Sequence, residues 1–217
     1  MSVVENGEIT QRGPGRPPVR SDADTLRLIL DAASEEFRTI GYAGTAMTAI
    51  AGRAGVSTKT LYRLVPTKAA LFRQVIHRRI ATFVLAMDAL EAGADDVAAG
   101  LERLLIAYAT LTLSSDAIAL QRLVLGESSR FPELGQAFYA DAVQRTGQLV
   151  AEWLERQCRR NLIRLDDPWS AAEMLRGMMI LEPQRAAMLG QAKAPDTAQI
   201  AKRAKACAQL FLNGCRV

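Results

Sequence analysis

The hydrophobic residues of this chain recur at intervals of three or four, which is the spacing of one face of an α-helix. The pattern is clearest between Asp22 and Ile40, where the apolar stripe consists of Leu28, Ala32, Phe37 and Ile40. Ser21 or Asp22 can cap the start of this segment, and Gly41 can end it. The pattern therefore predicts an amphipathic helix that buries one face.

The same spacing predicts further helices, separated by Gly, Pro, Ser and Asn residues. Their expected ranges are 47–54, 58–64, 68–90, 95–113, 115–129, 133–162, 168–189 and 195–213. The alternation typical of β-strands is missing from the sequence, and so is a repeat of fixed period. We therefore expect an all-α fold of about nine helices.

Composition narrows the class of protein. Of the 217 residues, 49% are hydrophobic and 23% are charged, which is typical of a globular protein. No apolar run approaches the roughly 18–20 residues that a membrane span needs, and the N-terminus is too polar for a secretion signal. Three widely spaced cysteines indicate neither a metal site nor a disulfide framework. We expect a cytoplasmic protein without membrane attachment and without a cofactor.

Charge is distributed unevenly along the chain. Residues 1–80 carry 12 Lys or Arg against 7 Asp or Glu, whereas residues 81–217 carry 15 against 16. The 51 residues from Phe37 to Met87 contain no acid and eight bases. These bases are Arg38, Arg53, Lys59, Arg63, Lys68, Arg73, Arg78 and Arg79. A surface with cations and without carboxylates favours a polyanion such as DNA.

A helix-turn-helix pattern lies inside this basic window, if Met47 is its first position. Ile50 and Ala54 then face the core, and Ala51 is small where the second helix crosses the first. Gly55 falls where the turn needs a left-handed backbone, which glycine adopts at little cost. Val56, Leu61 and Leu64 complete the apolar side, and Ser57 can cap the second helix.

The outward side of the second helix carries groups that reach phosphates and base edges. They are Thr58, Lys59, Thr60, Tyr62 and Arg63. The alternative is an ordinary helical hairpin with a solvated polar face. We favour DNA binding because every constrained position of the pattern agrees.

Residues 27–72 resemble the N-terminal domain of the tetracycline-repressor (TetR) family of transcriptional regulators. The similarity rests on Ile29–Ala33, Phe37, Gly41-Tyr42, Thr45, Ile50-Ala51, Ala54–Ser57, Thr60–Tyr62, Lys68 and Ala70–Phe72. It implies that Tyr62 and Lys68 hold phosphates and that Thr45 and Thr48 contact the DNA backbone. Leu64, Val65 and Ala69 depart from the residues common in the family at those positions, so the individual contacts need testing.

The N-terminal segment supplies a second candidate contact. Residues 1–21 are expected to form a disordered basic arm, and Gly15-Arg16-Pro17 resembles an AT-hook. An extended segment of this kind can place Arg16 in the narrow, negative minor groove of A·T-rich DNA. The alternative is a plain Pro- and Gly-rich linker.

The expected domains are therefore the arm, a DNA-binding domain over 22–80, and a ligand-binding and dimerisation domain over 81–217. Leu120–Glu127, Arg130–Leu134, Ala137–Tyr139 and Asp166–Pro168 are similar to the C-terminal domain of an AefR-like subgroup. Candidates for a ligand pocket are the apolar, aromatic and acidic residues of the middle helices. They are Met87, Leu104, Tyr108, Leu123, Glu127, Phe138, Trp153, Met174 and Met178.

Two apolar stripes near the C-terminus are candidates for a dimer interface. They contain Met178, Leu181, Arg185 and Met188 on one helix, and Ala201, Ala204, Ala208, Phe211 and Leu212 on the next. Two such helices from each subunit would form a four-helix interface. The alternative is that both stripes belong to the core of one chain, just as each pocket candidate is a candidate core residue.

These patterns predict a DNA-binding transcriptional regulator and not an enzyme, because His77 is the single histidine and no nucleophile motif or phosphate loop occurs. The expected form is a repressor that binds a palindromic double-stranded DNA operator as a homodimer. A small apolar or amphipathic effector would release it. The alternative is a helical ligand-binding or protein-interaction module whose basic part binds acidic partners nonspecifically.

Overall fold

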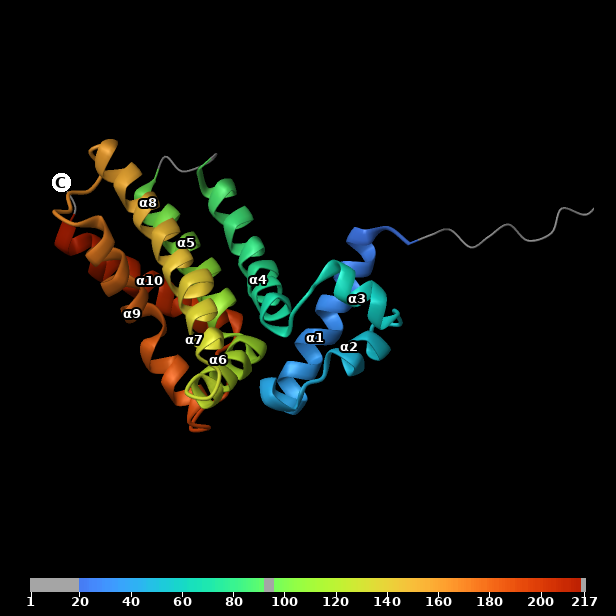
Figure 1. Cartoon of the computed structure of the whole chain (residues 1–217). Coiled ribbons are helices and arrows are strands. Elements are labelled where there is room, and N and C mark those ends of the chain that lie inside the picture. Colours follow the sequence, from blue (N-terminus) through green and yellow to red (C-terminus); the bar gives the residue numbers. More distant parts are fainter. Residues whose placement is uncertain (1–19, 92–95, 216–217) are drawn as a thin grey trace, which may run out of the picture.

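The computed structural model describes residues 20–91 and 96–215, and these residues form an all-α protein, as the sequence predicts. No β-strand occurs within the described ranges. Figure 1 shows two lobes, with α1–α3 in one and α5–α10 in the other, joined by the long helix α4. The elements are α1 Asp22–Gly44, α2 Met47–Arg53, α3 Thr58–Leu64, α4 Lys68–Glu91, α5 Val97–Leu113, α6 Ser115–Glu127, α7 Pro132–Phe138, the π-helix η1 Tyr139–Gln144, α8 Arg145–Arg159, α9 Pro168–Met188 and α10 Thr197–Cys215.

Helix α1 begins and ends where its sequence indicates. The hydroxyl of Ser21 accepts a hydrogen bond from the backbone N–H of Asp24, 3.0 Å away, and so caps the first turn. Regular helix stops at Gly41, whose φ of 84° and ψ of 170° suit glycine alone. The expected end at residue 40 is therefore confirmed, although one more helical turn follows before Thr45.

The helix expected over 133–162 is divided. Residues 139–144 form a π-helix between α7 and α8, and the helical run ends at Arg159. Asn161 follows in a left-handed conformation, with φ of 57°. A π-helix inserts one residue per turn and often marks a functional site. Nothing in the sequence pattern signals this insertion.

Two hydrophobic cores meet along α4. The first core joins α1–α3 to the first half of α4, up to Ile80, and also takes in Val124 of α6 and Leu134 of α7. The second core begins at Phe83 and is centred on α5, whose Leu101, Leu104 and Leu105 are fully buried. Helix α4 therefore belongs to both cores and connects the two lobes.

No single helix within the described ranges is long and apolar enough to cross a membrane. Helices α5 and α6 meet the length and composition criteria together, but they are bent by 57°.

Candidate nucleic-acid interface and internal cavity

The turn between α2 and α3 has the geometry that the sequence predicts. Ile50 and Leu61 are fully buried, so each helix of the pair places one face in the first core. Gly55 has a φ of 65°, which is the left-handed conformation expected at this position. The backbone N–H of Val56 donates to the carbonyl of Ala51 at 3.0 Å and closes the turn.

Helix α3 keeps its polar side in solvent. Ser57 caps it by accepting from the backbone N–H of Thr60 at 3.0 Å, and its hydroxyl also lies 2.8 Å from that of Thr60. The side chains of Thr58 and Lys59 are exposed, and Tyr62 is 47% exposed. The helix therefore presents a hydroxyl, an ammonium and a phenol to the outside, as expected of a helix that reads DNA.

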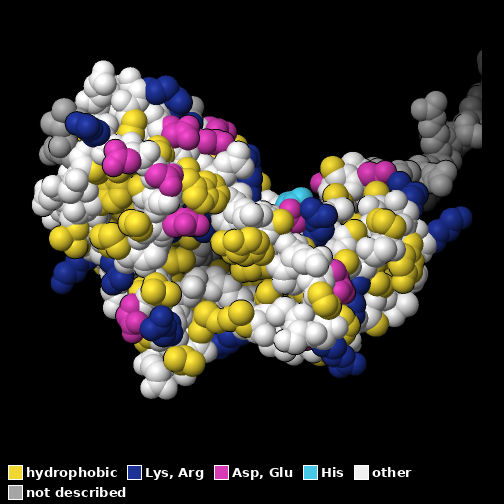
Figure 2. All heavy atoms as spheres, turned by 60° about the vertical axis from the view of Figure 1, so that its left-hand side comes forward, with side chains coloured by type: hydrophobic (Ala, Val, Ile, Leu, Met, Phe, Trp, Pro, Cys, Tyr) yellow, Lys and Arg dark blue, Asp and Glu magenta, His cyan; other side chains and the backbone are white. Residues whose placement is uncertain are grey.

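The acid-free window is not an acid-free surface. Six of its eight cations pair with carboxylates that come from outside the window. The pairs are Arg38–Glu35, Arg53–Glu36, Arg63–Asp22, Arg73–Asp141, Arg78–Asp31 and Arg79–Asp116. On the face drawn in Figure 2, acidic side chains lie beside Lys and Arg on both lobes. The inference from the window alone was therefore wrong in detail, because folding supplies the missing acids.

Arg63 illustrates the consequence for DNA contacts. Its guanidinium donates to both carboxylate oxygens of Asp22, at 2.8 and 2.6 Å, and this hydrogen-bonded partner lowers the pKa of Asp22. Both side chains are mostly exposed, so the pair contributes little and a phosphate can displace the carboxylate. Lys59, by contrast, forms no ion pair within the described residues and is free to bind an anion.

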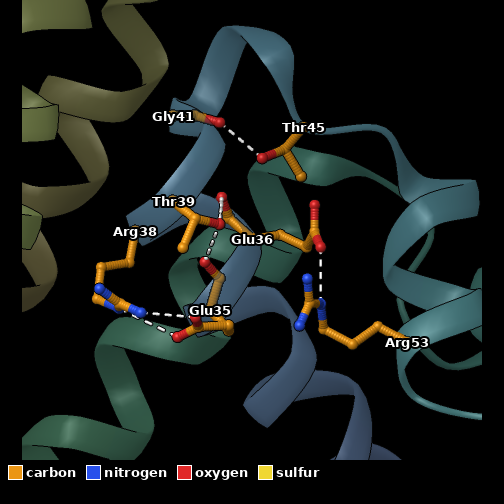
Figure 3. Close-up of polar contacts among 7 residues, drawn as sticks. All are labelled: Glu35, Glu36, Arg38, Thr39, Gly41, Thr45 and Arg53. Carbon is orange, nitrogen blue, oxygen red and sulfur yellow. Dashed lines mark hydrogen bonds and ion pairs between the residues drawn. The ribbon is translucent and has the colours of Figure 1, made fainter.

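Two of the expected backbone contacts have internal roles instead. Thr45 is only 3% exposed, and its hydroxyl donates to the carbonyl of Gly41 at 2.6 Å, so the predicted DNA contact through that hydroxyl is wrong (Figure 3). The ammonium of Lys68 donates to the carbonyls of Tyr42 and Thr45, at 2.7 and 2.9 Å. Lys68 therefore holds the α1–α2 turn, and a phosphate would have to share its ammonium with these carbonyls.

Glu36 fixes the position of α2 against α1. This carboxylate lies almost entirely inside the protein and pairs with Arg53 at 2.7 Å, as Figure 3 shows. Nothing in the sequence pattern indicates that the last acid before the window is buried. Thr48 is exposed on α2, as a backbone contact requires, whereas Arg16 lies outside the described residues.

A partly open cavity of about 230 Å³ lies in the larger lobe and is lined by α4–α9 and η1. Two of the predicted pocket residues, Tyr108 and Phe138, line it. The other residues of its wall are Ile76, Arg79, Ile80, Leu111, Thr112, Ala117, Leu120, Gln121, Ala142, Val143, Thr146, Arg176, Ile180 and Gln184. Sequence reasoning missed these residues, because several elements that are distant in the chain converge here.

The remaining pocket candidates lie elsewhere. Met87, Leu104 and Trp153 are buried in the second core, and Met178 packs against it. Leu123 packs on the first core and borders a separate hollow beside α1. Met174 is 68% exposed on the surface of α9. These six positions are corrected because helical periodicity alone cannot distinguish core, cavity and surface.

Glu127 is corrected as well, since its carboxylate joins the two lobes. It accepts hydrogen bonds from the backbone N–H groups of Tyr42 and Ala43, at 2.8 and 2.6 Å. These N–H groups follow Gly41, where the backbone leaves the helix. Glu127, the last residue of α6, thus provides hydrogen-bond acceptors for two backbone N–H groups at the end of α1. It is not part of the cavity wall.

The predicted dimer stripe on α10 is partly internal. Ala204, Ala208 and Leu212 are buried in the second core, so they cannot meet another subunit, and Phe211 packs against that core. Ala201 is exposed. The stripe on α9 faces outward at Leu181 and Arg185, while Met188 is half-buried. Met174, which the spacing places on the same α9 stripe, is 68% exposed, and Leu210 of α10 is 67% exposed.

Two family models match the chain. One describes bacterial regulatory proteins of the tetR family and matches residues 29–75. The other describes the C-terminal domain of AefR-like transcriptional repressors and matches residues 99–214, which is more than half of the chain. The chain belongs to the TetR family of transcriptional regulators. The resemblance noted in the sequence is therefore confirmed for both lobes.

Solved structures agree with the TetR assignment. A TetR-family transcriptional regulator from Mesorhizobium loti is 29% identical, with a TM-score of 0.77 over 91% of this chain and 100% of that chain. The flavonoid-responsive regulator FrrA is 28% identical, with a TM-score of 0.71 over 89% and 98%. A TetR-family regulator from Pseudomonas syringae pv. tomato shares the fold at 21% identity, with a TM-score of 0.67 over 88% and 96%. No curated protein sequence matches the chain.

The described residues of this TetR-family protein contain no group of three or more His, Cys, Asp or Glu side chains that could hold a metal ion. His77, the only histidine, lies on α4 beside Asp141, with 3.4 Å between its Nε2 and a carboxylate oxygen. The exposed groups of α3 and the cavity of the larger lobe therefore remain the two sites on which functional proposals can be built.

Proposed function

We propose that this TetR-family protein is a repressor that binds a palindromic operator as a homodimer and leaves it when a small molecule enters the cavity. The observation that carries the proposal is the outward face of α3, where Thr58, Lys59 and Tyr62 are exposed. This helix follows the turn after α2 and is capped by Ser57. A helix of this kind fits the major groove with its N-terminal residues toward the base edges.

Dimerisation follows from the small reach of α3, which spans only seven residues. One such helix contacts too few base pairs to be selective, whereas two copies on a palindrome double the site. The surface that we assign to this contact is the exposed apolar stripe of α9 and α10, with Met174, Leu181 and Leu210 at 68%, 54% and 67% exposure. Apolar groups gathered in this way favour a partner over solvent.

Release by a ligand follows from the place of the cavity. Ile76, Arg79 and Ile80 of α4 form part of its wall, and the first half of the same helix belongs to the core of the DNA-binding lobe. A ligand that prefers a shifted α4 would change the spacing of the two α3 helices and weaken DNA binding.

The proposal is tested by selecting bound DNA from a random pool and measuring affinity by fluorescence anisotropy with heparin as competitor. Enrichment of an inverted repeat that survives heparin supports the repressor. Uniform weak binding that heparin abolishes supports instead the alternative, a module whose basic part binds acidic partners nonspecifically.

A matched pair of lysine variants sharpens this test. Lys59→Ala removes the unpaired ammonium of α3 and is expected to weaken operator binding about tenfold and to alter the selected sequence at one position per half-site. Lys193→Ala removes an exposed ammonium from the loop before α10 and should change neither quantity. An unaltered sequence profile for Lys59→Ala would reduce Lys59 to a backbone contact.

A further inference from the structure

Both charged groups in the cavity wall are cations. Two guanidinium groups, those of Arg79 and Arg176, belong to the wall, and the wall contains no Asp or Glu. Thr112, Thr146, Gln121 and Gln184 add neutral polar groups. The rest of the wall is aliphatic or aromatic. Because an interior of low polarity strengthens electrostatic interactions, these two positive charges dominate the choice of ligand.

Arg176 is held in place without a carboxylate partner. Its Nε donates to the hydroxyl of Tyr108 at 3.0 Å, and Nη2 donates to the carbonyl of Val143 at 3.0 Å and to the hydroxyl of Thr146 at 3.4 Å. The guanidinium also lies over the ring of Tyr108, 5.3 Å from its centroid. All of these partners are neutral, so the charge of Arg176 has no counter-ion among the described residues.

One nitrogen of Arg176 remains available. Nη1 forms no hydrogen bond within the described residues. Every side-chain nitrogen or oxygen there that is inaccessible to solvent has a hydrogen-bond partner, so Nη1 is accessible to solvent. Gly147 makes room for it, since a methyl group at that position would overlap Nη1. The π-helix supplies the Val143 carbonyl that orients the group. The protein thus fixes a guanidinium at the wall, with Nη1 lying against Gly147.

Tyr108 adds a second directed donor. Burial raises the pKa of its phenol, which keeps the hydroxyl neutral, while the oxygen already accepts from Arg176. No acceptor for the hydroxyl proton lies within hydrogen-bonding distance among the described residues. Since a buried donor without an acceptor is costly, the proton of Tyr108 is directed to whatever occupies the cavity.

Arg79 brings the second charge from α4. Its side chain is 27% exposed, and its nearest carboxylate, on Asp116, lies 4.0 Å away on a mostly exposed side chain. Nη2 donates to the hydroxyl of Ser114 at 3.1 Å. Burial lowers the pKa of the Arg79 guanidinium, and the charge of Asp116 offsets only part of that effect.

We propose that the cavity takes a small amphipathic anion, whose carboxylate or equivalent group binds Arg176 and Tyr108 near Arg79 and whose apolar body packs on Phe138, Leu120 and Ile180. This inference rests on the proposed ligand response and specifies its chemistry. The volume of about 230 Å³ leaves room for a small aromatic acid. A cationic ligand is excluded by the two like charges.

Benzoate, cinnamate and 4-hydroxycinnamate, each paired with its methyl ester, test the charge requirement. Binding to the full chain is measured by calorimetry at neutral pH without DNA. We expect at least one acid to bind roughly tenfold or more tightly than its ester, as a hydrogen-bonded charge pair implies. Arg176→Gln and Arg79→Gln should each reduce that preference about tenfold while leaving ester binding unchanged.

Two variants keep the result interpretable. Arg176→Lys retains the charge and should retain the preference for the acid. If Arg176→Gln does not fold, Arg176→Lys and Arg79→Gln together still test the proposal. Arg103→Gln removes an exposed guanidinium from α5 and should change nothing. Equal binding of acid and ester, a preference that survives both Gln substitutions, or binding by none of the three acids would overturn the proposal. Because DNA is absent, that result would leave the proposed operator binding untouched.

Discussion

Replacing Gly41 by alanine should destabilise the protein through two separate effects. The first is backbone strain, because a φ of 84° with a ψ of 170° is accessible almost only to glycine and costs other residues about 1–3 kcal/mol. The second is steric, since the added Cβ would lie 2.7 Å from Oε1 of Glu127. The carboxylate would have to move away from the backbone N–H groups of Tyr42 and Ala43.

The second effect can be estimated from those hydrogen bonds. A hydrogen bond to a charged group contributes about 1.5–3 kcal/mol, but Ala43 is exposed, so we take about 2 kcal/mol for the pair together. Gly41→Ala should therefore lower the free energy of unfolding by about 3–5 kcal/mol. This is a large part of the roughly 5–15 kcal/mol typical of a folded protein.

A double-mutant cycle separates the two effects. In the Glu127→Ala background the hydrogen bonds are already lost, so Gly41→Ala should cost only the strain, and the coupling energy should be about 2 kcal/mol. Gly55→Ala is the matched control, because its φ of 65° carries strain while its Cβ would meet no atom within 4 Å. Urea unfolding followed by circular dichroism, at one protein concentration, measures all five proteins. Additive losses, or a loss for Gly41→Ala no larger than that for Gly55→Ala, would refute the reasoning.

Three further predictions follow from the contacts between the lobes and on the surface. Arg73, with a smaller effect of His77, holds the pKa of Asp141 below its usual range. The stability that this carboxylate contributes is therefore present above its unfolded pKa and lost as pH falls through the lower folded pKa. Asp141→Asn should make the free energy of unfolding depend less on pH in that range. Lys68→Ala should lower the free energy of unfolding, measured in urea without DNA, by about 1–2 kcal/mol, because two carbonyls lose their charged donor. An unchanged free energy of unfolding would show that Lys68 serves DNA alone. Leu181→Glu should shift a dimer toward monomer in sedimentation velocity, whereas Lys202→Glu, also exposed but polar on α10, should not.

The helices and the turn of the DNA-binding lobe were predictable because their signals are local. Ser21 and Ser57 cap the helices that they precede, and Gly55 takes the left-handed conformation that its position in the pattern requires. The burial of Ile50 and Leu61 follows from the same short spacing. Each of these features depends on residues within one or two helical turns, so the sequence contains the whole argument.

The candidate sites were predictable only in part. Of the pocket candidates, Tyr108 and Phe138 line the cavity, but Glu127 lies in an interlobe contact whose partners are about 85 positions earlier in the chain. Arg176 was missed because its significance comes from three neutral acceptors on other elements and from the missing carboxylate. The stripe on α10 had the correct period, yet periodicity does not say whether a face meets its own core or another chain.

By itself, the sequence determined the all-α class, the start and turn of the helix-turn-helix unit and the polar side of α3, because these are set by backbone preferences and by spacing along one element. Only the tertiary structure decided which charges stay free. The window from Phe37 to Met87 has no acid of its own, but carboxylates from α1, α6 and η1 neutralise most of its cations. Electrostatic interactions depend on distance in space, and distance in space is not written in the order of residues.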